Sequence, residues 1–260
     1  MITSIHNPKI KCVRELQADS QARKEARSFV VEGVRLAEEA LAAGWSAQLV
    51  LYTADLGKRG KDILAGFTAQ GVQVEQITDQ VMRAASDTET PQGILAVLAH
   101  KAVALPVTLD FVFIPDAVRD PGNLGTMLRS AAAAGVQAAF IPPGTVDPWS
   151  PKVVRAGMGA HFRLPIQALD WDEISQHLKC LQIYLAETNA GLPYTQADLR
   201  KPLALIVGGE AEGAGSQAQS LASAQVHIPM PGGSESLNAA VAAGVLLFEV
   251  VRQRREGASQ

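Results

Sequence analysis

The sequence predicts an α/β protein with two domains, the second of which contains a parallel sheet. Short apolar stretches alternate with helical patterns along nearly all of the 260 residues, as expected for strands separated by helices. Residues 111–114 and 203–207 are apolar at every position, which is typical of strands buried on both faces of a parallel sheet. Residues 100–109 follow neither period and include a proline. We therefore predict one domain over residues 1–105 and a second over residues 106–260.

Composition and charge indicate an ordinary globular protein with one basic region. Hydrophobic residues make up 47% of the chain, enough for a sizeable core, and the formal net charge is −3. Residues 1–27 nevertheless hold six Lys and Arg against three acidic residues. Cys12 and Cys180 form no spaced pair, which favours a reducing compartment and argues against a Cys-based metal site. No signal peptide or membrane span is recognisable, so we expect a cytoplasmic protein without a membrane partner.

The first domain begins with charged helices over residues 7–27, where Asn7 and Pro8 are typical of a helix start. Their basic face either follows a phosphate backbone or is a solvent-exposed amphipathic surface, and charge alone leaves both interpretations open. A regular alternation follows, which indicates a compact α/β/α unit. Strands are expected at 29–31, 48–52, 72–76 and 94–99, and helices at 35–43, 58–70 and 79–85.

The second domain continues the alternation around its apolar strands. A tight turn is expected at 120–123, and the helix that follows over 124–134 ends at Gly135. The other strands are expected at 111–114, 138–141, 162–166, 182–187 and 203–207, and the other helices at 151–156 and 171–181.

The last apolar run covers residues 226–251. It predicts a short strand ending at Ile228, a loop rich in Pro and Gly, and a helix that is apolar on most of its faces. Such a helix must be buried. Ser236 and Asn238 stand at its start, where side-chain oxygens can cap the free N–H groups of the first turn.

Two polar side chains stand out near the ends of the apolar strands. Arg129 lies in the middle of a helix of small and apolar residues, so it either extends to the surface or points into a cleft. Glu210 lies among glycines after a fully apolar strand, which suits either a permissive loop or a backbone held close to a ligand. The strand, turn and helix around Asn123 form an anion-receptive site but lack the full dinucleotide fingerprint.

Three short motifs follow in order at these strand ends. They are Asn123-x-Gly125-x-x-x-Arg129, then Gly209-Glu210-x-x-Gly213, and then Ile228-Pro229-Met230 with Ser236-Leu237-Asn238. Their kinds, order and spacing resemble the signature motifs of the SpoU (TrmH) family of RNA ribose 2′-O-methyltransferases, within the SPOUT superfamily. The N-terminal sequences N-P-K-I-K and F-V-V-E-G-V-R resemble the small substrate-binding domain of many members. One departure is Ala240, where many members carry Ser.

The resemblance implies a deep trefoil knot in the second domain, an exception to the rule that chains do not thread loops. It also implies S-adenosylmethionine as the cofactor and a homodimer formed through the knotted domain, with no metal. Cofactor contacts are expected at Gly208, Gly209, Ile228, Met230 and Leu237. Catalytic roles are expected for Asn123, Arg129, Glu210, Ser236 and Asn238.

The resulting hypothesis is an S-adenosylmethionine-dependent enzyme that methylates a ribose 2′-OH in structured RNA, with ribosomal RNA preferred. The family mechanism uses Arg129 to activate the 2′-OH, but free Arg is always protonated, so stabilising the developing alkoxide is the easier role. The alternatives are the same activity on tRNA and a catalytically idle RNA-binding assembly factor on the same fold. A doubly wound enzyme with a nucleotide cofactor is a third class, against which the missing G-x-G-x-x-G argues.

Overall fold

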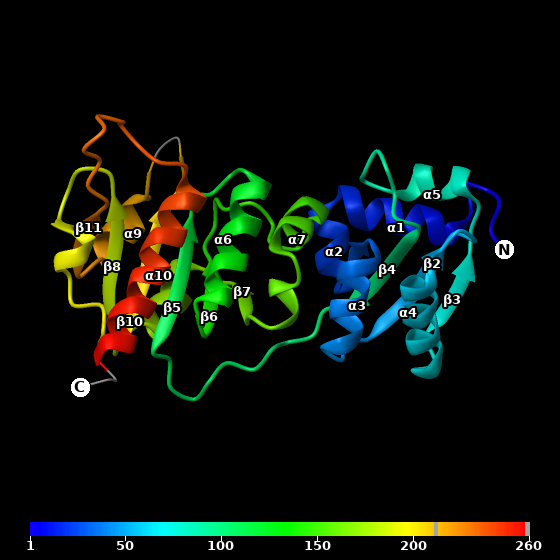
Figure 1. Ribbon diagram of the computed structural model, residues 1–260, viewed down its shortest axis with the longest axis horizontal. Helices are drawn as coiled ribbons and strands as arrows, with labels where there is room; N and C mark the ends of the chain where they lie inside the picture. The colour runs from blue at the N-terminus through cyan, green and yellow to red at the C-terminus, as the bar shows by residue number, and fades with distance from the viewer. Residues whose placement is uncertain (211–212, 258–260) are drawn as a thin grey trace. The chain divides into compact units, whose positions relative to one another are not determined.

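The computed structural model describes residues 1–210 and 213–257, and the chain divides into two compact units (Figure 1). The first unit contains Met1–Ala102 and Trp149–Phe162, and the second contains Val103–Pro148 and Arg163–Gln260. The segment Trp149–Phe162, which the sequence assigns to the second domain, therefore packs as part of the first unit.

The first unit is built on a four-stranded sheet with the order β1-β4-β2-β3. Strand β4 is antiparallel to both β1 and β2, whereas β2 and β3 are parallel. One face of the sheet packs against α1 and α5 through a cluster that includes Ile10, Val81 and Leu95. Helices α3 and α4 contact β1, β4 and β2, so the expected α/β/α unit is confirmed. The strands are β1 (Ser28–Glu32), β2 (Ala47–Tyr52), β3 (Gln73–Gln76) and β4 (Ile94–Ala99), and the helices are α1 (Pro8–Ala18), α2 (Ser20–Ala26), α3 (Val34–Ala42), α4 (Lys58–Ala69) and α5 (Asp79–Ala85).

The segment Trp149–Phe162 adds α7 (Pro151–Gly157) and the 3-10 helix η1 (Ala160–Phe162) to the first unit. Its contacts are aromatic and polar: the Trp149 ring lies 4.8 Å from that of Phe29, and Trp45 Nε1 donates to the Phe162 carbonyl over 3.3 Å. The expected strand at 162–166 is wrong except at its last residue, because Phe162 ends a 3-10 helix and β7 begins only at Ile166.

The second unit is built on a seven-stranded sheet with the order β7-β6-β5-β10-β8-β11-β9, and every adjacent pair is parallel. The predicted parallel sheet is thus confirmed. Its strands are β5 (Phe111–Asp116), β6 (Ala138–Ile141), β7 (Ile166–Ala168), β8 (Gln182–Glu187), β9 (Leu192–Pro193), β10 (Leu203–Gly208) and β11 (Ala224–His227). Its helices are α6 (Pro121–Ala133), α8 (Trp171–His177), α9 (Ser216–Leu221), α10 (Ala239–Gly257) and the 3-10 helix η2 (Tyr194–Gln196).

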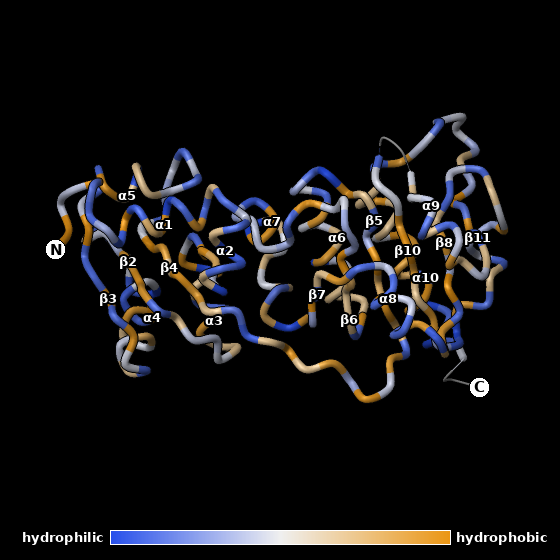
Figure 2. Tube along the Cα trace, turned by 180° about the vertical axis from the view of Figure 1, so that it is seen from behind, coloured by the Kyte–Doolittle hydropathy of each residue, from blue (hydrophilic) through white to orange (hydrophobic). Residues whose placement is uncertain are grey.

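Helices cover both faces of this sheet, because successive residues of a buried strand point to opposite sides. Ile114 and Ile206 lie in a core cluster together with residues of α8 and α9. Helices α6 and α10 pack against each other and against β5 and β10 (Figure 1). The hydropathy colouring shows β5 and β10 as largely apolar strands between these layers (Figure 2).

Several local expectations are corrected. Residues 120–123 do not form a tight turn: Asp120 accepts a hydrogen bond from Asn123 N (2.7 Å) and caps α6, which begins at Pro121. Proline is well suited to that first helical position, where its missing N–H is not needed. Helix α8 ends at His177, earlier than expected.

The expectation that the final helix is buried is only partly correct. Leu246, Leu247 and Val250 of α10 are buried, but Val241 and Phe248 are 53% and 48% exposed. Because those two residues are seven apart, they share one face of the helix. Among the described residues, no helix is long and apolar enough to cross a membrane.

Candidate active site

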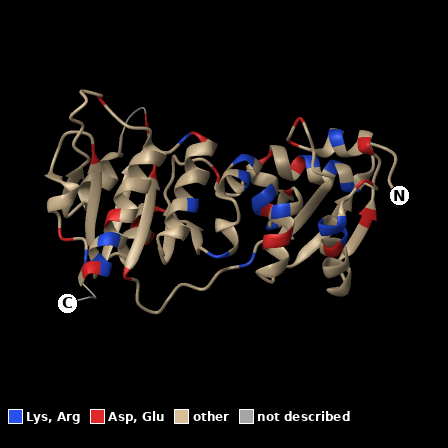
Figure 3. Ribbon diagram, in the orientation of Figure 1, with Lys and Arg blue, Asp and Glu red and all other residues tan. Residues whose placement is uncertain are grey.

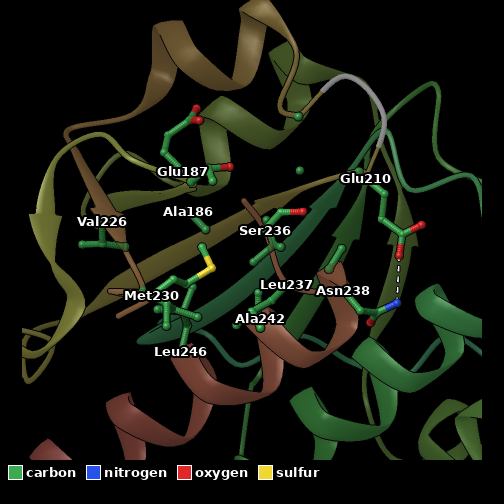
Figure 4. Close-up of a pocket in the computed structure, with 17 residues that line it drawn as sticks. Ala186, Glu187, Glu210, Val226, Met230, Ser236, Leu237, Asn238, Ala242 and Leu246 are labelled. Atoms are coloured by element: carbon green, nitrogen blue, oxygen red, sulfur yellow. Dashed lines mark hydrogen bonds between the residues drawn. The ribbon is translucent and has the colours of Figure 1, made fainter. Parts of the chain in front are cut away.

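A pocket of about 560 Å³ opens at the carboxyl ends of β8, β10 and β11, beside the start of α10 (Figure 4). The carboxyl ends of parallel strands meet at one edge of a sheet, and this edge is where α/β folds bind ligands. The loop between β11 and α10 forms one side of the pocket through Ile228, Met230 and Leu237. The last apolar run of the sequence therefore supplies a wall of this pocket.

All five residues expected to contact a cofactor line this pocket: Gly208, Gly209, Ile228, Met230 and Leu237. Much of the remaining lining is apolar, from Ala186, Val207, Val226, Ala242 and Leu246. Among the described residues of the lining, the charged ones are Glu187 and Glu210, and none is Lys, Arg or His. The described lining therefore suits a ligand with an apolar part and no net negative charge.

The two glycines at the end of β10 allow the backbone to pass very close to neighbouring loops. A Cβ at Gly208 would lie 2.4 Å from Ala214 N, and a Cβ at Gly209 would lie 2.2 Å from the Ala117 carbonyl oxygen. Ala117 itself has a left-handed backbone (φ 53), which is unusual for a residue with a side chain. The loops after β5 and β10 are thus packed together where only glycine fits.

One residue from each of the three sequence motifs meets in a hydrogen-bonded cluster, which we call the Asn–Glu–Asn cluster: Asn123, Glu210 and Asn238. Asn123 Nδ2 donates to Glu210 Oε1 over 2.5 Å, and Asn238 Nδ2 donates to the same oxygen over 2.8 Å. Asn238 Nδ2 also lies 3.0 Å from Asn123 Oδ1. Two amides thus hold one carboxylate oxygen, which leaves Oε2 available to another group.

Asn238 also caps α10. Its Oδ1 accepts hydrogen bonds from the N–H groups of Ala240 (2.9 Å) and Val241 (3.2 Å). The amide oxygen is therefore used by the helix, and the amide nitrogen faces Glu210 (Figure 4). Ser236 lines the pocket but lies before the helix, and within the described residues its hydroxyl oxygen accepts no hydrogen bond from the N–H groups of the helix start. Of the two expected caps, the structure supports Asn238.

Arg129 is not brought into this group. It is exposed on α6, it does not line the pocket, and it forms no hydrogen bond or ion pair with the described part of the chain. Six residues separate it from Asn123, which is about 9 Å along a helix. Of the two positions left open by the sequence, the structure places Arg129 at the surface of the isolated chain.

Asp116 anchors the far end of the loop that carries Glu210. Its carboxylate lies at the end of β5, is 3% exposed, and accepts a hydrogen bond from Gly215 N over 2.7 Å. Burial raises the pKa of Asp116, while the backbone N–H groups of Gly215 and Ala117 oppose that rise. The carboxylate thus joins the end of β5 to Gly215, the residue before α9.

Sequence reasoning missed Glu187 and Thr188, which line the pocket from the end of β8. A signal was present, because the apolar strand over residues 182–187 ends in an acidic residue at the edge where ligands bind. No group of three or more His, Cys, Asp or Glu within 1–210 and 213–257 is arranged to hold a metal ion.

Comparisons with known proteins identify the family of both parts of the chain. Residues 110–248 match the SpoU rRNA Methylase family, and residues 7–96 match the MRM3-like substrate binding domain. The chain is 33% identical to the 23S rRNA (guanosine(2553)-2′-O)-methyltransferase RlmP of Bacillus subtilis, over 96% of this chain and 98% of RlmP.

Two solved structures extend the comparison. An AdoMet-bound rRNA methyltransferase from Sinorhizobium meliloti superposes with a TM-score of 0.86 at 31% identity, covering 96% of this chain and 97% of that one. A TrmH/SpoU tRNA modifying enzyme from A. aeolicus gives a TM-score of 0.51 at 26% identity, over 57% of this chain and 77% of that one. The expected resemblance is confirmed, and the chain belongs to the SpoU rRNA methylase family.

Proposed function

We propose that this protein transfers the methyl group of S-adenosylmethionine to a ribose 2′-OH of ribosomal RNA. The observation that carries the proposal is the Asn–Glu–Asn cluster at one side of a pocket lined by five expected cofactor contacts. The cluster provides a fixed polar group next to the site where a methyl group would be presented.

The pocket fits this cofactor. Its volume of about 560 Å³ is in the usual range for small-molecule sites. Val226, Ile228 and Leu246 provide an apolar wall for a purine, and the glycine backbone at 208 and 209 allows close approach. The described lining has two acidic side chains and no basic one, which suits a ligand that carries a positive sulfonium.

The chemistry requires mainly alignment, because the bound cofactor supplies an already activated methyl group. Asn123 and Asn238 fix the Glu210 carboxylate, whose free oxygen can accept a hydrogen bond from the RNA or from the cofactor. Arg129 stabilises the negative charge that develops on the ribose oxygen, since a guanidinium stays protonated at ordinary pH. We assign Ser236, which lines the same pocket, to contact with the same part of the substrate.

A homodimer accounts for two features of the isolated chain, which are the exposed apolar face of α10 and the position of Arg129 outside the pocket. The exposed apolar face of α10, with Val241 and Phe248, is the surface that a second copy would cover. Because α6 packs against α10, that arrangement would bring Arg129 to the boundary between the copies. We also propose the trefoil knot, since the chain between β11 and α10 returns past the ends of β8 and β10 to reach α6.

The dimer is tested by replacing Phe248 with Asp. A charge on a face that is buried between copies opposes association, so sedimentation should change from a dimer to a monomer. Lys179→Asp, at an exposed position away from α10, is the control. If the wild-type protein sediments as a monomer at micromolar concentration, the dimer proposal fails.

Ribosomal RNA is the preferred substrate, because the RlmP match spans both units whereas the tRNA modifying enzyme matches little more than half of the chain. Lys and Arg positions mark much of α1 and α2 (Figure 3). Two of the six basic residues are structural: Lys9 pairs with Glu75, and buried Arg23 donates to the Leu16 carbonyl. The exposed ones that remain for phosphate contacts are Lys11, Arg14, Lys24 and Arg27.

The decisive experiment is methyl transfer to RNA from cells that lack this protein. Purified enzyme with radiolabelled S-adenosylmethionine should label ribosomal RNA, and mapping of 2′-O-methyl sites should show a modification absent from the untreated RNA. Labelling of tRNA alone would overturn the substrate preference, and no labelling with retained cofactor binding would favour an idle assembly factor. We place the protein in the cytoplasm, with support from its two free, exposed cysteines.

A further inference from the structure

We propose that Glu187 recognises the ribose hydroxyls of the cofactor's adenosine. This inference rests on the proposed function and assigns a residue that the three sequence motifs do not contain. Glu187 is the last residue of β8, it is partly buried, and it lines the pocket. It forms no hydrogen bond or ion pair within the described residues, so both of its oxygens are available to a ligand.

Glu187 and Glu210, the two acidic residues in the described part of the lining, lie on opposite sides of the pocket (Figure 4). Glu210 and Asn238 lie on one side, and Glu187 lies on the other, together with Val226 and Met230. A methyl group delivered at the Asn–Glu–Asn cluster therefore requires another part of the cofactor to extend toward β8.

The surroundings of Glu187 identify that part as the adenosine. Ala186, Val226 and Met230 form an apolar wall on this side, which suits the faces of a purine. The ribose is covalently joined to the purine and presents two adjacent hydroxyl groups. A carboxylate can accept a hydrogen bond from each of them, as acidic residues at strand ends do in dinucleotide-binding folds.

The test compares two neutral adenosine fragments by calorimetry: 5′-methylthioadenosine, which lacks the amino-acid part, and its 2′,3′-dideoxy analogue. Glu187→Ala should weaken binding of methylthioadenosine about 10- to 100-fold, the usual effect of losing hydrogen bonds to a charged group. The same change should alter binding of the dideoxy analogue less than about twofold, because that analogue has no hydroxyls to lose. The affinity of Glu187→Gln for methylthioadenosine should lie between those of wild type and Glu187→Ala.

Glu235→Ala is the matched control, since Glu235 is an exposed acidic residue of the β11–α10 loop that does not line the pocket. The assignment to the ribose would be overturned if Glu187→Ala lost affinity equally for both fragments. It would also be overturned if the variant lost affinity for S-adenosylhomocysteine but not for methylthioadenosine. Wild-type protein that binds no adenosine compound would overturn the proposed function as well. Wild-type binding that Glu187→Ala leaves unchanged would overturn this inference alone.

Discussion

The two sides of the pocket differ in how their acidic residues are held. Glu210 accepts hydrogen bonds from Asn123 and Asn238, so its position is set before any ligand binds. Glu187, at the end of β8, has no such partner in the described chain. A preorganised group suits a reaction, because it costs no rearrangement at the transition state. A group with free oxygens suits recognition, because the ligand provides the missing hydrogen bonds.

The comparison separates two experimental readouts. Changes on the Glu210 side should lower the rate at saturating cofactor, whereas changes at Glu187 should lower cofactor affinity. Changes at residues that support both sides of the pocket should lower both the rate and the cofactor affinity.

The largest effect is expected for Arg129→Ala, which tests whether the reaction side includes a residue outside the pocket. Methyl transfer should fall about 1,000-fold or more, because charge stabilisation at the reacting oxygen is lost. Cofactor affinity, measured by calorimetry, should stay nearly unchanged since Arg129 does not line the pocket. Arg129→Lys, which keeps the charge without the planar fork, should retain part of the rate. Wild-type turnover by Arg129→Ala would contradict the role.

Asn238→Asp separates the cap from the Asn–Glu–Asn cluster. Asp also caps helices, so the melting temperature should change little. The donor to Glu210 is lost and a second carboxylate is placed beside it, so methyl transfer should fall about 100-fold through misplacement of the site. Thermal melts and single-turnover rates measure the two effects. A variant as active as wild type would mean that Asn238 serves only the helix.

Gly209→Ala should disturb both sides of the pocket. The new Cβ would meet the Ala117 carbonyl oxygen, so the loops after β5 and β10 must separate, at a cost of about 1–3 kcal/mol in unfolding free energy. Cofactor affinity and methyl transfer should fall together. Gly232→Ala is the control, because its Cβ would meet no atom within 4 Å. Loss of transfer with unchanged affinity would show that the loop serves the reaction side alone.

The smallest effect is expected for Asp116→Asn. Burial raises the pKa of Asp116, so the folded protein holds its proton more tightly than the unfolded chain. The stability that this proton contributes is fully present below the unfolded pKa and is lost as pH rises through the folded pKa. The unfolding free energy of wild type relative to Asp116→Asn should therefore decline as the pH rises above about 3.9, the ordinary pKa of an unfolded aspartate, until the pH has passed the raised folded-state pKa. Urea unfolding at a series of pH values measures this difference, and Asp172→Asn, at an exposed position, is the control. A difference in unfolding free energy that increases as the pH rises would contradict the prediction.

Sequence reasoning predicted most of the architecture because the decisive signals are local. The apolar runs that became β5 and β10 need no partner information, since a strand buried on both faces is apolar at every position. The three motifs were also readable, and the resemblance that they carry implied a shared cleft, in which Asn123, Glu210 and Asn238 meet whereas Arg129 does not.

What the sequence did not predict depends on contacts between distant segments. Helix α9 (Ser216–Leu221) is short and polar, and it is placed by burial of Ala218 against the sheet rather than by a strong helical pattern. The role of Asp120 as a cap could not be distinguished from a turn, because Asp-Pro-Gly-Asn suits both. Glu187 looked like an ordinary strand end until the fold placed it in the pocket.

The divided use of Asn238 has a consequence for how the protein ages. Asparagine amides hydrolyse slowly to carboxylates, a recognised weakness of this residue at high temperature. Deamidation at Asn238 would keep the oxygen that caps α10 and remove the nitrogen that faces Glu210. Damaged molecules would stay folded and continue to bind ligand, so their loss would be visible as a falling fraction of active sites rather than as aggregation.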